Sequence, residues 1–382
     1  MTKILSAVIV VMSTILGIST DTFPGQNEPA ARCKIVFICK DRDCDNLYVV
    51  DADGANQKKL VDNKNWCRLK VPECSVDGKQ IAFESAETIN SKICVMAADG
   101  ADLKKITKSD KALDRQPAWS PDGKKIAFVS GALSKGDIYV MGADGSNPQN
   151  LTKNKSDDYG PVWSPDGKKI AFVSQSPVAL EDGSIDYYDP AEIYVMNADG
   201  SGLKRLTERD AQDYDPVWSP DSTKLLFTSK PLESKDRETN TSIKGNILGG
   251  VRVEEKKGKP IFKFGKPDIF IINIDGSNLQ NLTNNPDKDE YPDWSADGSS
   301  IVFISCREGD PDAVYIMAAN GSNPKSLAVS EDGREFSCAR WSPDNKKIAY
   351  IQDKEQICVI DANGSNRVEA AKGREYAWLL AK

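Results

Sequence analysis

The stretch that decides the fold is Pro161-Val-Trp-Ser-Pro-Asp-Gly-Lys-Lys-Ile-Ala-Phe-Val-Ser174, and it returns nearly intact at 117–130. In Ser164-Pro-Asp-Gly167 the proline presets φ and the glycine accepts a positive φ, which is typical of a tight turn. The residues on either side of this turn, 161–163 and 169–173, are rich in β-formers and apolar with a strand-like period. The stretch therefore predicts two short antiparallel strands joined by a turn.

A second phrase follows each copy of the first. Its form is Ile138-Tyr-Val-Met-Gly-Ala-Asp-Gly145, closing on Leu151-Thr152, and it predicts a third strand, a second turn and a short outer strand. Four short antiparallel strands, repeated about every 45 residues, are the sequence signature of a β-propeller blade. Complete units are anchored at Cys74, Trp119, Trp163, Trp218, Trp294 and Trp341.

Two of the units contain insertions. Successive anchors are 45, 44, 55, 76 and 47 residues apart, so the third and fourth intervals are the long ones. These intervals place insertions at 175–190 and 230–267. Within the second insertion, 249–254 and 259–264 are expected to form the two arms of a hairpin. Insertions on a repeat scaffold map to loops on one face, often the binding face.

The two ends of the chain are expected to build one blade together. The first strand, 34–38, matches the second strand of a unit, and the tail 376–380 matches a first strand that no second strand follows. Pairing them closes the ring and removes exposed sheet edges. Second strands occur at Ile35, Ile81, Ile126, Ile170, Leu225, Ile301 and Ile348. The prediction is one closed all-β propeller of seven four-stranded blades over 34–382, with a six-bladed ring as the alternative.

Composition excludes several classes of function. The 382 residues include 50 basic and 57 acidic side chains, a net charge of −7, whereas nucleic-acid binding needs a basic surface. The chain has no histidine, which removes Ser-His-Asp triads, histidine zinc sites and imidazole bases. Nothing in the sequence indicates a cofactor, and no residue is singled out as catalytic or as a metal ligand.

The N-terminus predicts export from the cytoplasm. Lys3 precedes an apolar run over 4–18 and then small residues, a pattern typical of a secretory signal peptide over 1–19, with a short polar lead over 20–33. The run is short for a membrane-spanning helix of about 20 residues, so an uncleaved anchor is the less favoured alternative. We expect a periplasmic or extracellular protein with no transmembrane span after signal removal.

Nine cysteines fit an oxidising compartment. Cys39 and Cys44 are spaced for a hairpin disulfide. A metal site formed by Cys39, Cys44, Cys67 and Cys74 is a sharper alternative, but it lacks the paired CxxC spacing of such sites. The sequence does not determine how the cysteines are connected.

Two recurrent motifs have structural explanations. In the Trp-Ser-Pro-Asp-Gly set, the tryptophan is expected to pack between blades and the aspartate to cap backbone N–H groups. The Asp-Ala-Asp-Gly phrase at 51–54 resembles the start of a calcium loop, but the further spaced ligands are missing and a β-turn explains it.

A third pattern supplies the candidate binding residues. The position five residues before the tryptophan is aspartate in four successive units, at Asp114, Asp158, Asp213 and Asp289. Residues just before the innermost strands gather around one mouth of a propeller's channel, so these carboxylates are expected to give that mouth a negative potential. The alternative is that they are solvated loop acids that help turns to form. No pair of carboxylates is distinguished enough to be named as acid and base.

The two recurrent phrases resemble the propeller repeats of the TolB family, and similar repeats form the propellers of prolyl oligopeptidase-like and tricorn-like peptidases. The resemblance covers the chain from about residue 34 and implies the fold more specifically than the function. For the TolB family it implies a periplasmic propeller that binds a peptidoglycan-associated lipoprotein at one channel mouth. That family has an additional N-terminal domain and six blades, whereas here 14 residues separate the predicted signal from the first strand. The peptidases need a catalytic serine and histidine, and the histidine is missing.

Two functions follow from the sequence. The favoured one is a non-catalytic scaffold that binds a protein partner of the cell envelope or extracellular surface through one channel mouth, using Asp114, Asp158, Asp213 and Asp289. The alternative is a carboxylate-based enzyme that acts on polysaccharide, or a propeller that binds glycan. Seven-fold repetition favours the scaffold, and unusual acids confined to one or two blades would favour the enzyme.

Overall fold

The computed structural model describes residues 32–381, except for 42–43, 64–67, 87–89, 109–111, 133–134, 180–184, 189, 238–259, 308–310 and 331–332. The predicted signal peptide, most of the polar lead and Cys67 lie outside the described residues. The described part of the chain contains no helix with the length and apolar character needed to cross a membrane.

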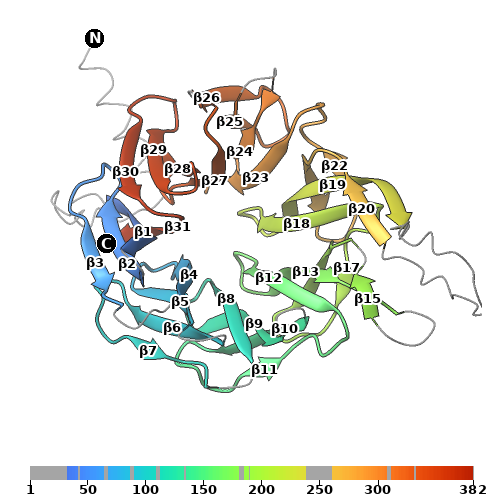
Figure 1. Ribbon diagram of the computed structural model, residues 1–382, viewed down its shortest axis with the longest axis horizontal. Helices are drawn as coiled ribbons and strands as arrows, with labels where there is room; N and C mark the ends of the chain where they lie inside the picture. Colours follow the sequence, from blue (N-terminus) through green and yellow to red (C-terminus); the bar gives the residue numbers. More distant parts are fainter. Residues whose placement is uncertain are drawn as a thin grey trace, which may run out of the picture. The chain divides into compact units, whose positions relative to one another are not determined.

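Seven four-stranded antiparallel sheets follow one another around a ring (Figure 1). Each blade has an inner strand beside the channel, then a second, a third and an outer strand. The predicted seven-bladed all-β propeller is confirmed, and the six-bladed alternative is wrong.

The blades are numbered here in chain order, and their strands are given from the channel outward. Blade 1 contains β31 (Glu375–Ala381), β1 (Arg32–Asp41), β2 (Cys44–Asp51) and β3 (Lys58–Val61). Blade 2 contains β4 (Arg68–Cys74), β5 (Gln80–Ala86), β6 (Ser91–Ala97) and β7 (Lys104–Lys105), and blade 3 contains β8 (Leu113–Trp119), β9 (Lys125–Ala132), β10 (Lys135–Gly142) and β11 (Gln149–Asn150). Blade 4 contains β12 (Asp157–Trp163), β13 (Lys169–Gln175), β16 (Glu192–Asn197) and β17 (Lys204–Arg205), and blade 5 contains β18 (Ala211–Trp218), β19 (Lys224–Arg237), β21 (Asp268–Asn273) and β22 (Gln280–Asn281). Blade 6 contains β23 (Asp289–Trp294), β24 (Ser300–Ser305), β25 (Ala313–Ala318) and β26 (Lys325–Val329), and blade 7 contains β27 (Phe336–Trp341), β28 (Lys347–Gln352), β29 (Gln356–Asp361) and β30 (Val368–Lys372).

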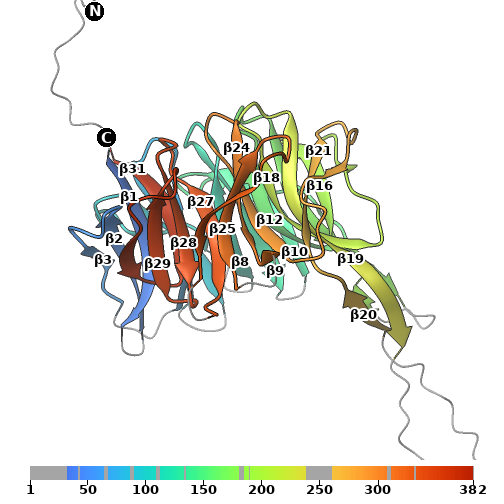
Figure 2. The same ribbon diagram turned by 90° about the horizontal axis from the view of Figure 1, so that it is seen from above.

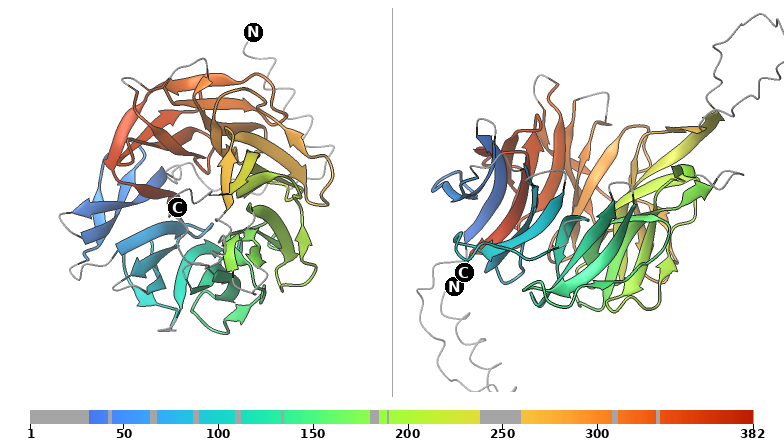
Figure 3. Two further views of the ribbon diagram at one scale, coloured as in Figure 1. Left: turned by 45° about the vertical axis from the view of Figure 1, so that its right-hand side comes forward. Right: turned by 60° about the horizontal axis from the view of Figure 1, so that its bottom comes forward.

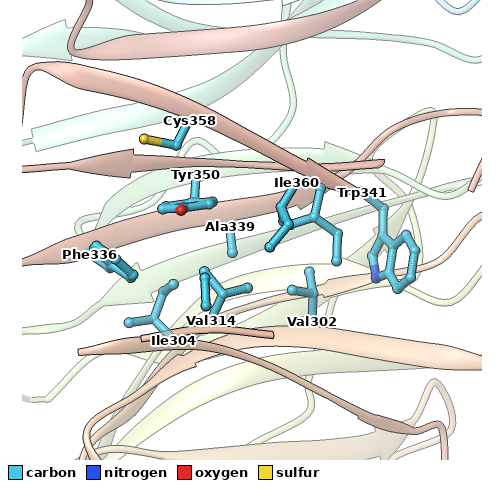
Figure 4. Close-up of a cluster of buried hydrophobic side chains, with 11 residues drawn as sticks. Val302, Ile304, Val314, Phe336, Ala339, Trp341, Tyr350, Cys358 and Ile360 are labelled. Atoms are coloured by element: carbon cyan, nitrogen blue, oxygen red, sulfur yellow. The ribbon is translucent and has the colours of Figure 1, made fainter. Parts of the chain in front are cut away.

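The hydrophobic core lies between successive blades. In one such cluster, Val302 and Val314 of blade 6 pack against Trp341 and Tyr350 of blade 7 (Figure 4). Burying one such side chain stabilises the fold by about 1.5–3 kcal/mol, and a blade alone would leave both its faces in water. The Lys-Ile-Ala-Phe strands are apolar on both sides because a neighbouring blade covers each side.

The Trp-Ser-Pro-Asp-Gly motif has the structural role expected from the sequence. Ser164 Oγ donates to Asp166 Oδ1 at 2.6 Å, and Asp166 Oδ1 also accepts a hydrogen bond from the backbone N–H of Lys168 at 3.1 Å. The Trp163 indole N–H donates to the carbonyl oxygen of Ala118 in the preceding blade at 3.2 Å. Equivalent bonds join Trp119 to Glu73, Trp218 to Val162 and Trp378 to Arg340. The motif therefore closes a turn within one blade and joins that blade to its neighbour.

The 51–54 phrase forms a β-turn. The Gly54 N–H donates to the Asp51 carbonyl at 2.9 Å, and Asp53 Oδ1 accepts the N–H of Ala55 at 2.9 Å. The Asp53 oxygen is thus engaged in holding the turn.

The chain ends close blade 1, as predicted. β31 pairs antiparallel with β1, with Lys34 opposite Leu379 and Phe37 opposite Tyr376. Next to this junction, Gly78 of blade 2 approaches β31 so closely that a Cβ at residue 78 would lie 1.9 Å from the Leu380 carbonyl oxygen. Only glycine fits this approach.

The two ends of the channel open on different faces. On the turn face lie the turns that join inner to second strands and third to outer strands. On the insertion face lie the blade-to-blade connectors and both insertions. There β19 continues beyond its blade and pairs with β20 (Pro260–Phe264), with Leu232 opposite Phe264, and the resulting ribbon projects from the ring (Figures 2 and 3). The first insertion forms a smaller ribbon from β14 (Pro177–Ala179) and β15 (Ile185–Tyr188).

In the second insertion, 260–264 pairs with the extension of β19. The predicted partner arm 249–254 lies outside the described residues, so the hairpin between 249–254 and 259–264 stays a prediction. The suggested Cys39–Cys44 disulfide is wrong, because the register puts Cys39 opposite Asn46 and the Cys44 thiol is free. Among the described residues, no three cysteine or acidic side chains gather as metal ligands. The four-cysteine site includes Cys67 and is not tested.

Candidate functional site

The four candidate aspartates occupy equivalent places at the insertion-face ends of four inner strands. Each lies opposite a serine of the second strand in its own blade, 16 residues later in the chain. The pairs are Asp114 with Ser130, Asp158 with Ser174, Asp213 with Ser229, and Asp289 with Ser305. Asp114 is 2% exposed and the other three aspartates are 0% exposed. The structure thus places them inside four separate blades and does not bring them together on an open rim.

These carboxylates hold the connectors between blades. Ser130 Oγ donates to Asp114 Oδ1 at 2.7 Å, and Ser174 Oγ donates to Asp158 Oδ1 at 2.6 Å. The second oxygen of Asp158 accepts a bond of 2.8 Å from the Asn154 side chain in the connector from blade 3 to blade 4. One aspartate thereby fixes a connector to the end of a second strand.

Basic side chains lie beside three of the four carboxylates. Arg209 is 2.9 Å from Asp213, Arg307 is 3.3 Å from Asp289, and Lys92 is 3.7 Å from Asp114. Burial raises the pKa of Asp158 and of Asp289, against the hydrogen bonds that lower it. The expected negative rim is therefore corrected, because these charges are buried and locally offset. Their role in partner binding stays a prediction.

Six inner strands carry the same backbone irregularity. The residue three positions before the anchor has a positive φ of 48–61°, and the pairing with the second strand shifts register there. The residues are Val71, Gln116, Gly160, Asp215, Tyr291 and Cys338. In a non-glycine residue this conformation costs on the order of 1–3 kcal/mol. Five of these six inner strands therefore carry local backbone strain beside the channel.

The insertion-face end holds an open groove of about 870 Å³ between blades 5 and 6. Its lining has three lysines, three acids and five other residues: Lys230, Lys266, Lys288, Glu233, Glu290, Asp312, Gln212, Phe264, Gly265, Pro267 and Cys306. Lys230 Nζ lies 3.4 Å from Glu290 Oε1, and Lys288 Nζ lies 3.3 Å from Asp312 Oδ1. The Tyr214 hydroxyl donates to Glu290 Oε1 at 3.0 Å. Charges of both signs therefore meet in this groove.

The turn-face end holds a second cavity, of about 470 Å³, to which all seven blades contribute. We call the residue directly before each anchor, or before the equivalent Trp378 of β31, a channel position, because these residues line the cavity. They are Glu73, Ala118, Val162, Val217, Asp293, Arg340 and Ala377. Four are small and apolar, and three are charged.

The three charged channel positions form one electrostatic group. Arg340 lies 3.9 Å from Asp293 Oδ1, and Asp293 Oδ2 accepts the backbone N–H of Trp341 at 2.8 Å. Burial raises the pKa of Glu73 to about 7, with Arg340 opposing the shift. Burial likewise raises the pKa of Asp293, against the attraction of Arg340. Glu73 can therefore exchange a proton near neutral pH.

The comparisons with known proteins agree with the ring just described. The family model described as TolB beta propeller domain matches residues 26–177 and 260–373. The chain belongs to this family. A curated relative, the protein TolB homolog of Chlorobium luteolum, is 27% identical over 140 residues, which are 34% of this chain and 32% of the relative. The chain thus matches about a third of that TolB homolog's length.

Solved structures share the fold of this TolB-type propeller. TolB from Acinetobacter baumannii is 18% identical with a TM-score of 0.51, and the match covers 97% of this chain and 70% of that one. An oligogalacturonate lyase in complex with manganese is 11% identical with a TM-score of 0.59, over 90% of this chain and 86% of that one. At these identities the likeness establishes the fold alone.

Sequence reasoning missed the charged channel positions of this TolB-type propeller. The available signal was a departure from the repeat, since Glu73, Asp293 and Arg340 stand where other units have alanine or valine. Sequence reasoning also missed the serine partners of the aspartates. Their signal was the serine that stands two residues after the phenylalanine of each second strand, and its position opposite the aspartate depends on the register.

Proposed function

We propose that the protein is a periplasmic or extracellular, non-catalytic scaffold that binds a protein partner of the envelope through the insertion-face mouth of its channel. The observation that carries this proposal is the groove of about 870 Å³ at that mouth. Residues of the 230–267 insertion form one wall of the groove, so no other blade has an equivalent of this wall among the described residues. Insertions on a repeat scaffold are where a binding face is expected. Glu233 of β19 and Phe264 of β20 line the groove, and the two strands continue from there as the projecting ribbon.

The charged side chains of the groove support a protein partner. Three lysines and three acids give the groove charges of both signs. Within it, Lys230 and Lys288 each pair with Glu290. Both lysines of these pairs are partly exposed at the groove, so they can exchange Glu290 for charges on a partner. We propose that Asp114, Asp158, Asp213 and Asp289 support binding indirectly. They would hold the connectors that shape the mouth, without contacting the partner.

The test is affinity capture with the full chain, using an extract of the cell envelope in which the protein occurs, followed by mass spectrometry. The double variant Lys230→Gln, Lys288→Gln is expected to weaken capture of the main partner at least tenfold, and added salt should weaken the wild-type interaction. Lys168→Gln, an exposed lysine of the turn face, is the matched control. Unchanged capture by the double variant would remove this mouth as the binding site.

The alternative function is a carboxylate-based enzyme acting on polysaccharide, and one observation favours it. The acids Glu73 and Asp293 are confined to two blades, and the raised pKa of Glu73 suits a proton donor at neutral pH. The fold is also that of an oligogalacturonate lyase. Incubation with polygalacturonate and other acidic polysaccharides tests the idea, with Glu73→Gln as control. New chain ends formed by the wild type but not by the variant would replace the scaffold proposal.

A further inference from the structure

The turn-face cavity has two unlike halves. Blades 3, 4 and 5 present Ala118, Val162 and Val217 to it, together with their tryptophans. Blades 6, 7 and 2 present Asp293, Arg340 and Glu73. An apolar wall thus faces a polar wall across a space of about 470 Å³, which lies within the usual range of about 300–1,000 Å³ for small-molecule sites.

Arg340 is the cation of the polar wall, and the protein uses few of its donors. One terminal nitrogen donates to the Pro292 carbonyl at 3.3 Å and lies 3.9 Å from Asp293. Among the described residues, Nε and the other terminal nitrogen have no hydrogen-bond acceptor. The side chain is 41% exposed although protein surrounds it, because it lines the cavity. A guanidinium with open donors in such a place matches a planar acceptor.

Trp341, next to Arg340 in the chain, adds an aromatic surface to the same wall. The residue is 8% exposed, and its indole nitrogen has no acceptor among the described residues. By contrast, the indole N–H groups of Trp119, Trp163, Trp218 and Trp378 donate to carbonyl oxygens of the preceding blade. The Trp341 nitrogen is buried, so a ligand in the cavity would meet the indole ring and not its N–H.

We propose that the turn-face end of the channel binds a small amphipathic carboxylate. Its apolar body would lie against Ala118, Val162 and Val217, and its carboxylate would accept hydrogen bonds from Arg340. The proposal concerns the end of the channel opposite the insertion-face mouth. It therefore holds or fails independently of the scaffold function.

The site also has a defined pH dependence. The titratable groups around Arg340 are Glu73 from blade 2, Asp215 from blade 5, Asp293 from blade 6, and Cys338 and Tyr376 from blades 7 and 1. Glu73 is largely protonated below pH 7 and gains a charge above it. Because that charge repels an anionic ligand, affinity should fall as pH rises through 7. A coupling of one pKa unit corresponds to a tenfold loss of affinity.

The experiment uses two probes with the same ring and opposite charge, phenylacetate and phenethylamine, with binding measured by calorimetry and by quenching of the tryptophan fluorescence. The wild-type full chain should bind phenylacetate and not phenethylamine. Arg340→Met should lose at least tenfold in phenylacetate affinity. Arg334→Met, at an exposed arginine paired with Asp353, is the matched control and should bind as wild type. Preference for phenethylamine, or an Arg340→Met variant that binds equally well, overturns the proposal.

A second variant keeps the proposal testable if Arg340→Met does not fold. Glu73→Gln removes the proton exchange and leaves Arg340 in place. Between pH 6 and 8 the wild type should lose about tenfold in phenylacetate affinity, whereas Glu73→Gln should lose less than twofold. Parallel pH profiles for the two proteins would show that Glu73 does not face the ligand, and the site assignment would be wrong.

Discussion

The same seven inner strands build both ends of the channel, yet their charged side chains do different things there. At the insertion-face end the recurring aspartates are buried and bonded within their blades, as Asp158 is to Ser174. At the turn-face end the charges that do not recur, Glu73, Asp293 and Arg340, line an open cavity. The recurring charges of this repeat protein are thus bonded inside their blades, whereas the charges that depart from the repeat face a cavity.

The largest expected effect comes from removing an inner strand that serves both ends at once. Deletion of residues 373–382 takes away β31, uncovers β1 and removes the Trp378 bond to blade 7. Because each blade is stabilised by its neighbours, we expect loss of cooperative unfolding, or aggregation. Thermal and urea unfolding followed by two spectroscopic probes will check this. A truncated protein that melts like the full chain would mean that the ring does not need its terminal strand.

The structural role of the aspartates can be tested with two matched substitutions. Asp213→Asn leaves Arg209 partly buried without its ion pair and should destabilise the fold by about 3–5 kcal/mol. Asp158→Asn loses hydrogen bonds from uncharged groups only and should cost about 1 kcal/mol. The free energy of unfolding in urea gives both values. If neither variant is destabilised, the recurrence has another cause and the comparison fails at this end.

The closure of the ring can be separated from the general demands of its turns. Gly78 and Gly123 hold equivalent turn positions with φ of 70° and 67°, so alanine should cost each about 1 kcal/mol. Only at residue 78 does the new Cβ meet the Leu380 carbonyl, and we expect about 2 kcal/mol of additional cost there. Equal losses of stability in the two variants would argue against the tight contact between β31 and blade 2.

At the turn-face end the test is the pH dependence of stability. The folded-state pKa of Glu73 is about 7, above its ordinary value, so the folded protein keeps a proton that the unfolded chain releases. Stability from this residue is complete at acidic pH and is lost as pH rises towards 7, by at most about 1.4 kcal/mol per pH unit. Glu73→Gln should flatten that decline in urea unfolding between pH 5 and 8. Parallel curves for the variant and the wild type would place Glu73 in contact with bulk water.

The smallest expected effect concerns the indole hydrogen bonds between blades. Trp163→Phe removes a bond of 3.2 Å to the preceding blade, whereas the equivalent nitrogen of Trp294 has no acceptor among the described residues. Both residues are buried to a similar degree, so the loss of apolar contact should be comparable. Trp163→Phe should therefore be about 1 kcal/mol more destabilising than Trp294→Phe in urea unfolding. A reversed order would mean that packing outweighs these bonds.

The fold could be predicted from the sequence because the same side chains do the same work in every blade. The offset of the repeat at the two termini even predicted which strands pair, 34–38 with 376–380. The pairing of 260–264 with the extended β19 was not predicted, because the insertion has no repeat to compare with. The hairpin expected between 249–254 and 259–264 stays a prediction, because 249–254 lies outside the described residues.

The candidate site was predictable only in part. The register of the aspartates was correct, but their burial depends on a serine 16 residues later, whose place opposite the aspartate follows only from the strand pairing. The channel positions depend on the register shift next to the positive-φ residue, and only Gly160 shows this in its residue type. Val71 adopts the same conformation although a β-branched residue disfavours it, so tertiary packing must impose it. The number of inner strands can therefore be predicted from the sequence, but the side chains that face the channel cannot.

The pairing of β1 with β31 has a consequence for the order of the chain. Arg32 lies opposite Ala381, so the two described ends of the ring are neighbours in one sheet. A short linker could join them, and a new opening could be cut at the turn of Gly123, where no other atom lies within 4 Å of a Cβ. Such a circular permutant would close through β8 and β9 in place of β31 and β1. The ring has no intrinsic first blade, and any blade could be the one completed by the two ends of the polypeptide.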